Sequence, residues 1–482
     1  MVELLLFGSF LVLLLLGVPV AFAMGGSAFL TIAVADGVTA LFPTAGIMYA
    51  SLSSETLLAI PFFILAGVVM EITGISGRLI DLADALVGHQ KNGLALTTIL
   101  AALLFSSISG SGPATVAALG AILIPALAKQ GYKKRHAASL VASAGEMGIV
   151  IPPSIAFIVF AVVASDYERI SIGRLFLAGV VPGLMMAIAF YLVARFLPRE
   201  LETAKTNAKD HLNKALGRPK SSDLVTAVGD SARSSSNTNV LTVDDVNPEA
   251  VQPGSRRTRA SLPVIGRAFV RAIPGLLVPV IILGGIYGGI FTPTESAAVA
   301  SVYALLVGIF VTRKLNIRGL MKVFTTAGIQ SGRIMLIISA ATLFAYVITR
   351  HRIASQVADG LLSITDNAVI IILLINLMLL IAGMFLDAVS AFYLFVPLFV
   401  PVLLELGMDI TTIGIVMTIN LAIGLVTPPV GIDLFVAAGI AKIPFSEAVK
   451  GIWPFLIAGI VVLMLLTFIP ILSNGLPDLM GM

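Results

Sequence analysis

Two short stretches of the chain combine the residue types that hold a metal cation. Residues 106–115 read SSISGSGPAT, so hydroxyl groups and glycines interrupt a long apolar run. Residues 148–154 read GIVIPPS, and the two successive prolines remove two amide donors. The carbonyl groups near residues 148 and 149 are thereby expected to lose their helical partners. Hydroxyl and carbonyl oxygens are ligands that hard cations prefer, so both stretches are candidate cation sites.

Both stretches return later in the chain at a constant spacing. Residues 385–388 read FLDA and residues 424–429 read GLVTPP, and they lie 276 positions after 109–112 and 148–153. The same spacing relates three further pairs, which are Ile72-Thr73 with Ile348-Thr349, Ile124-Pro125 with Val400-Pro401, and Gly131 with Gly407. Glycine and proline each make up only about 5–7% of ordinary sequences, so one shared spacing predicts an internal duplication.

These breaks predict two Na⁺ sites related by the duplication. Hydroxyl, carboxylate and freed carbonyl oxygens would supply the ligands, from Ser109, Ser111, Gly148, Ile151 and Pro153 in one site and from Asp387, Gly424, Thr427 and Pro429 in the other. Half-helix N-termini at the same depth attract an anionic group. We therefore assign substrate binding to nearby residues, namely Gly112, Pro113, Thr115, Ser154 and Ser390. A single such break more often serves packing, but matched pairs favour function.

Four carboxylates lie within or beside apolar segments, where ionisable groups are costly. Asp387 takes the place of Ser111 in the second repeat, so we rank it first as an ion ligand. Glu146 is a candidate to ligate an ion, accept a proton or pair with a cation. Glu295 follows Thr292-Pro293-Thr294, which favours helix capping over transport. Asp433, one turn beyond Pro429, is open between a structural and a transport role.

The composition places these residues in a membrane protein. The chain has 482 residues, of which 58% are apolar and 12% charged, a mean hydropathy of +1.04 and no cysteine. Soluble domains carry about 25% charged residues, so a cytosolic globule is excluded, as are a disordered chain and a disulfide-framed secreted protein. We attribute the net charge of +4 to cytoplasmic loops and expect a lipid bilayer as the environment and no nucleic-acid partner.

Apolar runs of spanning length predict an all-α architecture of about ten spans in three parts. Residues 1–198 form the first membrane repeat, with a hairpin at 94–128, and residues 266–482 form the second, with a hairpin at 366–405. Between them, the polar stretch 199–265 predicts a disordered cytoplasmic loop. Residues 78–92 and 351–366 fit amphipathic arms on the membrane surface. Residues 3–23 predict a retained first helix, because no basic residue precedes the apolar run.

Charge on the loops indicates how the two repeats are oriented. The loop after the first hairpin carries Lys129, Lys133, Lys134 and Arg135, which predicts a cytoplasmic position. The matching loop after the second hairpin carries Glu405 and Asp409 and no basic residue, which predicts the opposite side. The sequence therefore predicts an inverted repeat with both termini outside and a re-entrant hairpin from each side, an arrangement typical of alternating-access secondary transporters.

Three other classes of protein fit less well. An intramembrane serine protease needs a general base beside Ser109 or Ser111, and no histidine lies within a predicted span. An ATP-driven pump needs a phosphate-binding Gly-x-x-x-x-Gly-Lys-[Ser/Thr] loop, which the sequence lacks. A channel with two re-entrant hairpins stays open as an alternative, although channels of the water-pore type are shorter and lack Pro-Pro breaks.

Three motifs together resemble one transporter family. They are SGSGPAT at 109–115, GIVIPPS at 148–154 and GIFTPTE at 289–295, and GVPVAFA at 17–23 and GLVTPPV at 424–430 extend the likeness. The chain resembles the large membrane subunit, of DctM type, of tripartite ATP-independent periplasmic (TRAP) transporters. The resemblance covers nearly the whole chain except about 201–263, which departs from the family pattern.

The resemblance implies a machine with further parts. It implies a small four-helix membrane subunit, a periplasmic substrate-binding protein that delivers an organic anion such as a carboxylate or sialic acid, and a location in the bacterial inner membrane. It also implies Na⁺ as the coupling ion and an elevator movement of both hairpins. The family's sodium ligands correspond to the five residues assigned above to the first site. A stand-alone Na⁺/dicarboxylate symporter of the divalent-anion type is the alternative within transporters.

Overall fold

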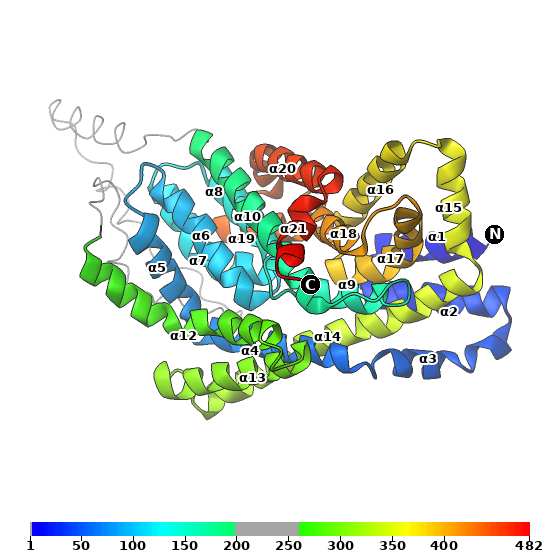
Figure 1. Ribbon diagram of the computed structural model, residues 1–482, viewed down its shortest axis with the longest axis horizontal. Coiled ribbons are helices and arrows are strands. Elements are labelled where there is room, and N and C mark those ends of the chain that lie inside the picture. The colour runs from blue at the N-terminus through cyan, green and yellow to red at the C-terminus, as the bar shows by residue number, and fades with distance from the viewer. Residues whose placement is uncertain (1, 198–259) are drawn as a thin grey trace, which may run out of the picture.

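The computed structural model describes residues 2–197 and 260–482, and over these residues the fold is helical with no β-strand (Figure 1). The all-α prediction is therefore confirmed for the described chain. The predicted loop at 199–265 lies mostly outside the described residues. Its end is already helical, because a helix begins at Leu262.

The helices of the first half precede the undescribed segment. They are α1 (Val2–Leu15), α2 (Val20–Ala35), α3 (Thr44–Ser51), α4 (Ala59–Ile72), α5 (Ile75–Val87), α6 (Gly93–Ser109), α7 (Gly112–Lys129), α8 (Lys134–Val150), α9 (Ile155–Ala164) and α10 (Ile172–Phe196).

The helices of the second half follow it. They are α12 (Leu262–Tyr287), α13 (Pro293–Leu306), α14 (Ile317–Arg350), α15 (Ile353–Ile364), α16 (Ala368–Gly383), α17 (Ala388–Glu405), α18 (Ile410–Gly424), α19 (Ile432–Ala441), α20 (Phe445–Phe468) and α21 (Ile471–Leu479).

The helix boundaries reproduce the spacing seen in the sequence. Helices α7 and α17 begin at residues 112 and 388 and end at 129 and 405, and α8 and α18 begin at 134 and 410, so each pair is again 276 positions apart. The amphipathic arms predicted at 78–92 and 351–366 correspond to α5 and α15. Each half therefore contains an arm, a helical hairpin and a broken helix in the same order.

The number of helices able to cross a membrane is smaller than predicted. By length and composition eight described helices qualify, or nine if the bent pair α8–α9 counts as one span, against the ten expected. The predicted single helix at 3–23 is wrong, because Gly17 takes a φ of +82° and Pro19 follows it. Glycine adopts this left-handed conformation without a steric penalty, so the chain turns between α1 and α2.

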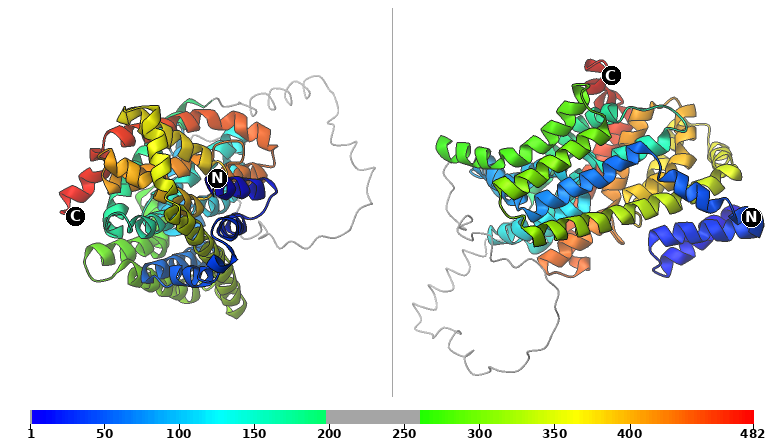
Figure 2. Two further views of the ribbon diagram at one scale, coloured as in Figure 1. Left: turned by 90° about the vertical axis from the view of Figure 1, so that its right-hand side faces the viewer. Right: turned by 90° about the horizontal axis from the view of Figure 1, so that it is seen from below.

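The helices form two packed layers. Figures 1 and 2 show α12, α13, α4 and α14 running along one side of the molecule, and the hairpin helices and broken helices lying along the other. Helix α13 packs on α4, and α14 packs on α2, α4 and α17. Within the second layer α8 contacts α6, α7, α19 and α20, so it lies at the centre of the candidate site.

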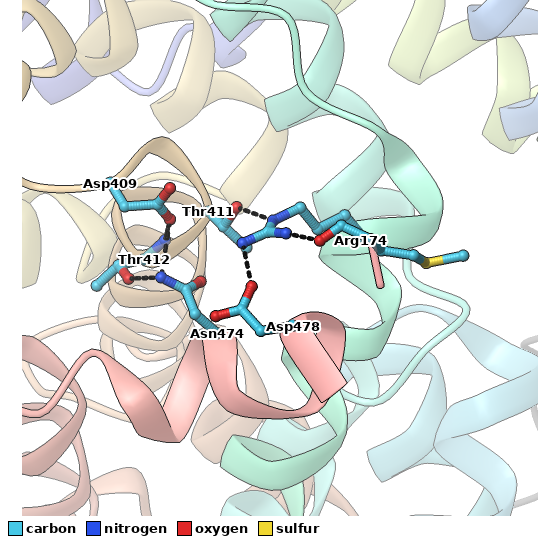
Figure 3. A network of polar contacts seen from close by, with 7 residues as sticks. Arg174, Asp409, Thr411, Thr412, Asn474 and Asp478 are labelled. Atoms are coloured by element: carbon cyan, nitrogen blue, oxygen red, sulfur yellow. Dashed lines mark hydrogen bonds and ion pairs between the residues drawn. The ribbon is translucent and has the colours of Figure 1, made fainter. Parts of the chain in front are cut away.

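A polar network fixes the start of α18 against α10 and α21 (Figure 3). Arg174, in the first turn of α10, donates from Nε to Thr411 Oγ1 at 3.0 Å and pairs with Asp478 at 2.9 Å. Asp409 caps α18 and accepts a hydrogen bond from Asn474 Nδ2 at 3.0 Å. Helix α18 carries the second break at its other end, so this network positions the break.

Candidate functional site

The first hairpin tip is a tight turn between two helices. Gly110 ends α6 with a φ of +61°, and Ser111 is extended, so α7 begins at Gly112 with Pro113 in its first turn. Proline suits this position because the first helical amides have no partner within the helix. Ser109 Oγ and Thr115 Oγ1 donate to the Ser111 carbonyl at 3.2 and 2.8 Å. The tip thus gathers oxygen atoms around Ser111.

The first break lies between α8 and α9, which meet at a bend of 45°. Ser154 occupies the N-cap of α9, where its Oγ accepts from the Ala156 amide at 3.2 Å and donates to the Ile149 carbonyl at 2.5 Å. The Ile149 carbonyl, expected to lack a partner, therefore has one. Ile151 and Pro153 lie buried in the same break.

The tip and the break meet at Gly148. A methyl group added to Gly148 would lie 2.6 Å from the Ser111 carbonyl oxygen and 2.9 Å from Thr115 Oγ1. Only a residue without a side chain permits this approach. The structure therefore brings together Ser111, Thr115 and Gly148, three of the residues assigned to the first ion site and to substrate binding, from segments more than thirty positions apart in sequence.

The second hairpin tip is built differently. Asp387 is the N-cap of α17, and its Oδ2 accepts from the amides of Val389 and Ser390 at 3.1 and 3.4 Å. Ser390 Oγ donates to the other carboxylate oxygen at 2.6 Å. Ser390, predicted to bind substrate, is fully buried beside this carboxylate. The negative charge thus lies at the positive end of the α17 dipole.

The second break also contacts its hairpin, through glycines. A methyl group on Gly424 would lie 2.5 Å from the Gly383 backbone, at the end of α16. Thr427 Oγ1 donates to the Ile423 carbonyl at 2.7 Å, and the Gly431 amide donates to the Met384 carbonyl at 3.5 Å. The break that contains Pro429 therefore lies against residues 383–384, three to four positions before Asp387.

The remaining carboxylates separate into a capping group and a buried pair. Glu295 forms a capping box with Thr292, which confirms the prediction for this residue. Glu146 and Asp433 are buried, with 1% and 0% of their surfaces exposed. Asp433 Oδ2 lies 2.5 Å from where a methyl group on Gly112 would be, a contact between the repeats that sequence reasoning missed. The glycines at 112 and 145, on facing helices, were the available signal. In the described chain no three His, Cys, Asp or Glu side chains gather as a metal cluster.

Comparison with known proteins finds relatives over nearly the whole chain. Residues 7–472 match a family model described as tripartite ATP-independent periplasmic transporter, DctM component. The isethionate TRAP transporter permease protein DctMQ of Oleidesulfovibrio alaskensis is 37% identical over 96% of this chain, which spans 65% of that protein's length.

Two further relatives match over most of their own length. The C4-dicarboxylate TRAP transporter large permease protein DctM of Pseudomonas aeruginosa is 37% identical over 89% of this chain and 87% of its own. The sialic acid TRAP transporter large permease protein SiaM of Vibrio cholerae is 33% identical over 97% and 96%.

Solved structures share the fold at low sequence identity. The YdaH transporter of Alcanivorax borkumensis superposes with a TM-score of 0.60 at 14% identity, over 98% of this chain and 97% of that one. MtrF of Neisseria gonorrhoeae gives a TM-score of 0.55 at 15% identity, over 97% of both chains. The helical arrangement is therefore one that membrane transporters adopt.

Proposed function

Because the chain belongs to the DctM family of TRAP transporter large permeases, we propose that it imports an organic anion by Na⁺-coupled secondary transport. The observation that carries this proposal is the paired contact of a hairpin tip with a broken helix, at Gly148 in the first repeat and at Gly424 in the second. Non-helical backbone within a membrane lines a cavity or a binding site, and two such places in matching positions suit ion coupling.

The two Na⁺ sites proposed from the sequence use residues of these contacts. Ser109, Ser111 and the carbonyls of the first break would hold one ion. The Asp387 carboxylate and the carbonyls of the second break would hold the other, and Asp387 would then serve both the ion and the α17 cap. Sodium binding in each place would draw hairpin and break together, which links ion binding to the shape of the substrate site.

The names of the relatives and the geometry of the first tip support an organic anion as the substrate class. Isethionate, C4-dicarboxylates and sialic acid, for which the relatives are named, are all organic anions. The first turn of α7 lacks a side-chain cap at Ser111, so its amides are available to an anionic group. We propose that Gly112, Pro113 and Thr115 face the substrate on this side, and that Ser154 and Ser390 complete the site.

The protein would work with two partners in the bacterial inner membrane. A periplasmic binding protein would deliver the anion, and a small four-helix membrane subunit would extend the layer formed by α4, α12, α13 and α14. We propose that this layer stays fixed while the layer containing both hairpins and both breaks moves across the bilayer as an elevator. From the charge on the loops, we also propose that both termini lie on the periplasmic side.

Sodium supplies enough free energy for this movement. One Na⁺ entering through a potential of 100 mV releases about 2.3 kcal/mol. A tenfold concentration gradient adds about 1.4 kcal/mol for each ion. Two ions together release roughly 7 kcal/mol, before the cost of moving an anion against the potential is subtracted. ATP is not needed for accumulation on this scale.

Reconstitution into proteoliposomes tests the proposal. The permease, with its small subunit and binding protein, should accumulate a radiolabelled organic anion when an inward Na⁺ gradient is imposed, and should not do so with K⁺. Accumulation that needs no binding protein would support a stand-alone symporter instead. Flux that equilibrates without Na⁺ would support a channel, and either result would overturn the proposal.

A further inference from the structure

Two carboxylates that the proposed sites do not use lie on neighbouring helices in the interior. Glu146 belongs to α8, and Asp433 belongs to the first turn of α19, which packs on α8. Both side chains are buried to 99% or more. Glu146 Oε2 and both oxygens of Asp433 have no hydrogen-bond partner among the described residues. Buried carboxylate oxygens without donors are strongly unfavourable, so each carboxyl group needs either a bound proton or a cation beside it.

The surroundings of the pair supply more oxygen and no basic side chain. Ser143 lies one turn before Glu146 on α8, is fully buried and has no hydrogen-bond partner for its Oγ. Basic residues of the described helices that pack on α8 and α19 occur only in the first two turns or the last turn. Arg135, for example, is eleven residues from Glu146, or about 16 Å along the helix.

The N-termini of α7 and α19 offset part of the negative charge of the two carboxylates. Asp433 lies in the first turn of its own helix and against Gly112, the first residue of α7. Each helix N-terminus carries roughly half a positive charge, so the two together offset at most about one carboxylate charge, and less while a substrate anion occupies the α7 N-terminus. With both carboxyl groups ionised, at least about one negative charge is left, which a monovalent cation would neutralise.

Glycine at position 112 lets the start of α7 come close to the Asp433 carboxylate. A methyl group on Gly112 would lie 2.5 Å from Asp433 Oδ2, and one on Gly145 would lie 3.5 Å from the same oxygen and 3.3 Å from the Gly112 carbonyl oxygen. Gly112 therefore leaves the space that the Asp433 carboxylate occupies, whereas a methyl group on Gly145 would first meet the side chain of Val116. Ser143, Glu146 and Asp433 would together offer an oxygen-only ligand set, as Na⁺ prefers.

The pair has no counterpart in the duplication. The positions 276 residues away from Glu146 and Asp433 are Ala422 and Phe157, which carry no oxygen in their side chains. The duplication therefore does not generate this pair, although it lies beside the first ion site, since Glu146 is two residues before Gly148 and Asp433 lies against Gly112. It joins helices of both repeats, at the base of the first hairpin tip.

We propose that Glu146 and Asp433, with Ser143, ligate a third Na⁺ at the junction of α7, α8 and α19. This proposal rests on the Na⁺ coupling proposed above. The ion would bind both repeats to the first hairpin tip, so its occupancy would set whether α7 and α19 stay together. Each transport cycle would then be linked to three ions instead of two.

Counting bound sodium tests this site without measuring transport. The purified full chain, with its small subunit, is equilibrated with ²²Na⁺ in nanodiscs, and the bound ions per permease are counted at saturation. Three ions are expected for the wild type and two for the double variant Glu146→Gln with Asp433→Asn. The matched control Glu295→Gln exchanges a carboxylate for an amide in an exposed capping box that glutamine also completes, and should keep three.

The single variants keep the test valid if the double variant does not fold. Glu146→Gln and Asp433→Asn alone should each raise the Na⁺ concentration for half-saturation of one ion at least tenfold. Two ions in the wild type, or an unchanged count and affinity in every variant, would overturn the third site and leave the proposed function intact. Release of protons in place of Na⁺ from the pair would also overturn it. A wild type that binds no Na⁺ would overturn the proposed function itself.

Discussion

The two hairpin tips occupy matching positions in the duplicated chain, but they treat charge in opposite ways. In the second tip, Asp387 caps its own helix and holds Ser390. In the first tip, Ser111 provides no side-chain cap, and a carboxylate from the other repeat, that of Asp433, lies against Gly112. The two repeats therefore share their helix boundaries but differ in which segment supplies the carboxylate at the hairpin tip.

The contacts between tip and break differ as well. Gly148 approaches the start of α7, the helix after its tip, at Ser111 and Thr115. Gly424 instead approaches the end of α16, the helix before its tip, at Gly383. The first contact places a glycine beside oxygen atoms, and the second places a glycine beside another glycine backbone. We expect the first site to depend on its hydroxyl groups and the second on its charge, and the following changes test that expectation.

Removing the hydroxyls of the first tip should have the largest effect. In the double variant Ser109→Ala with Ser111→Ala, loss of two oxygen ligands at about 1.5–3 kcal/mol each should lower Na⁺-driven uptake roughly 100-fold or more. Expression and docking of the binding protein should be unchanged, as measured by size-exclusion chromatography and surface plasmon resonance. Uptake at the wild-type rate would remove this ion site.

Adding a methyl group at either break comes next. Gly148→Ala and Gly424→Ala would each push against backbone atoms at less than 3 Å. Overpacking of this kind should cost about 1–3 kcal/mol of stability, measured as a lower melting temperature in detergent, and should lower uptake about tenfold or more. Gly439→Ala is the matched control, because nothing lies within 4 Å of its added methyl group. Wild-type stability in both variants would show that tip and break do not meet as described.

Neutralising the second tip should have a smaller effect. Asparagine also caps helices well, so Asp387→Asn should preserve α17 and remove only the charge. We expect the Na⁺ concentration for half-maximal uptake to rise about tenfold, or 1.4 kcal/mol. Asp387→Ala should in addition lower the melting temperature, because it removes the cap. If the asparagine variant kept the wild-type sodium dependence, the second site would not use this carboxylate.

The smallest effect is expected at Glu295. Glutamine completes a capping box nearly as well as glutamate, so Glu295→Gln should change stability by less than about 0.5 kcal/mol and leave the sodium dependence of uptake unaltered. A larger loss of sodium dependence here than in Asp387→Asn would reverse the order in which we rank the two carboxylates.

Sequence reasoning located most of what is local in this molecule. The Pro-Pro motifs marked both breaks, the glycines and Pro113 marked the start of α7, and Thr292 with Glu295 marked a helix cap. Each of these depends on residues within a few positions of one another. The approach of Gly424 to Gly383 and of Asp433 to Gly112 joins segments far apart in sequence, and no local pattern encodes it. The turn between α1 and α2 was missed because Gly17 and Pro19 stand within otherwise continuous apolar sequence.

Helix α14 is longer than the hydrocarbon core of a bilayer is thick. Its 34 residues extend about 51 Å, against a hydrocarbon thickness of about 30 Å, and even a tilt of 40° leaves roughly 9 Å outside. Its first half carries exposed Arg318 and Lys322, while most of its second half is buried or half-buried and ends with Arg350, which pairs with Asp36 at 2.9 Å. One end is therefore anchored in protein and the other reaches the lipid headgroups. Since α17 packs on this helix, the proposed elevator movement would carry the second hairpin along a helix that is itself held in place at both ends.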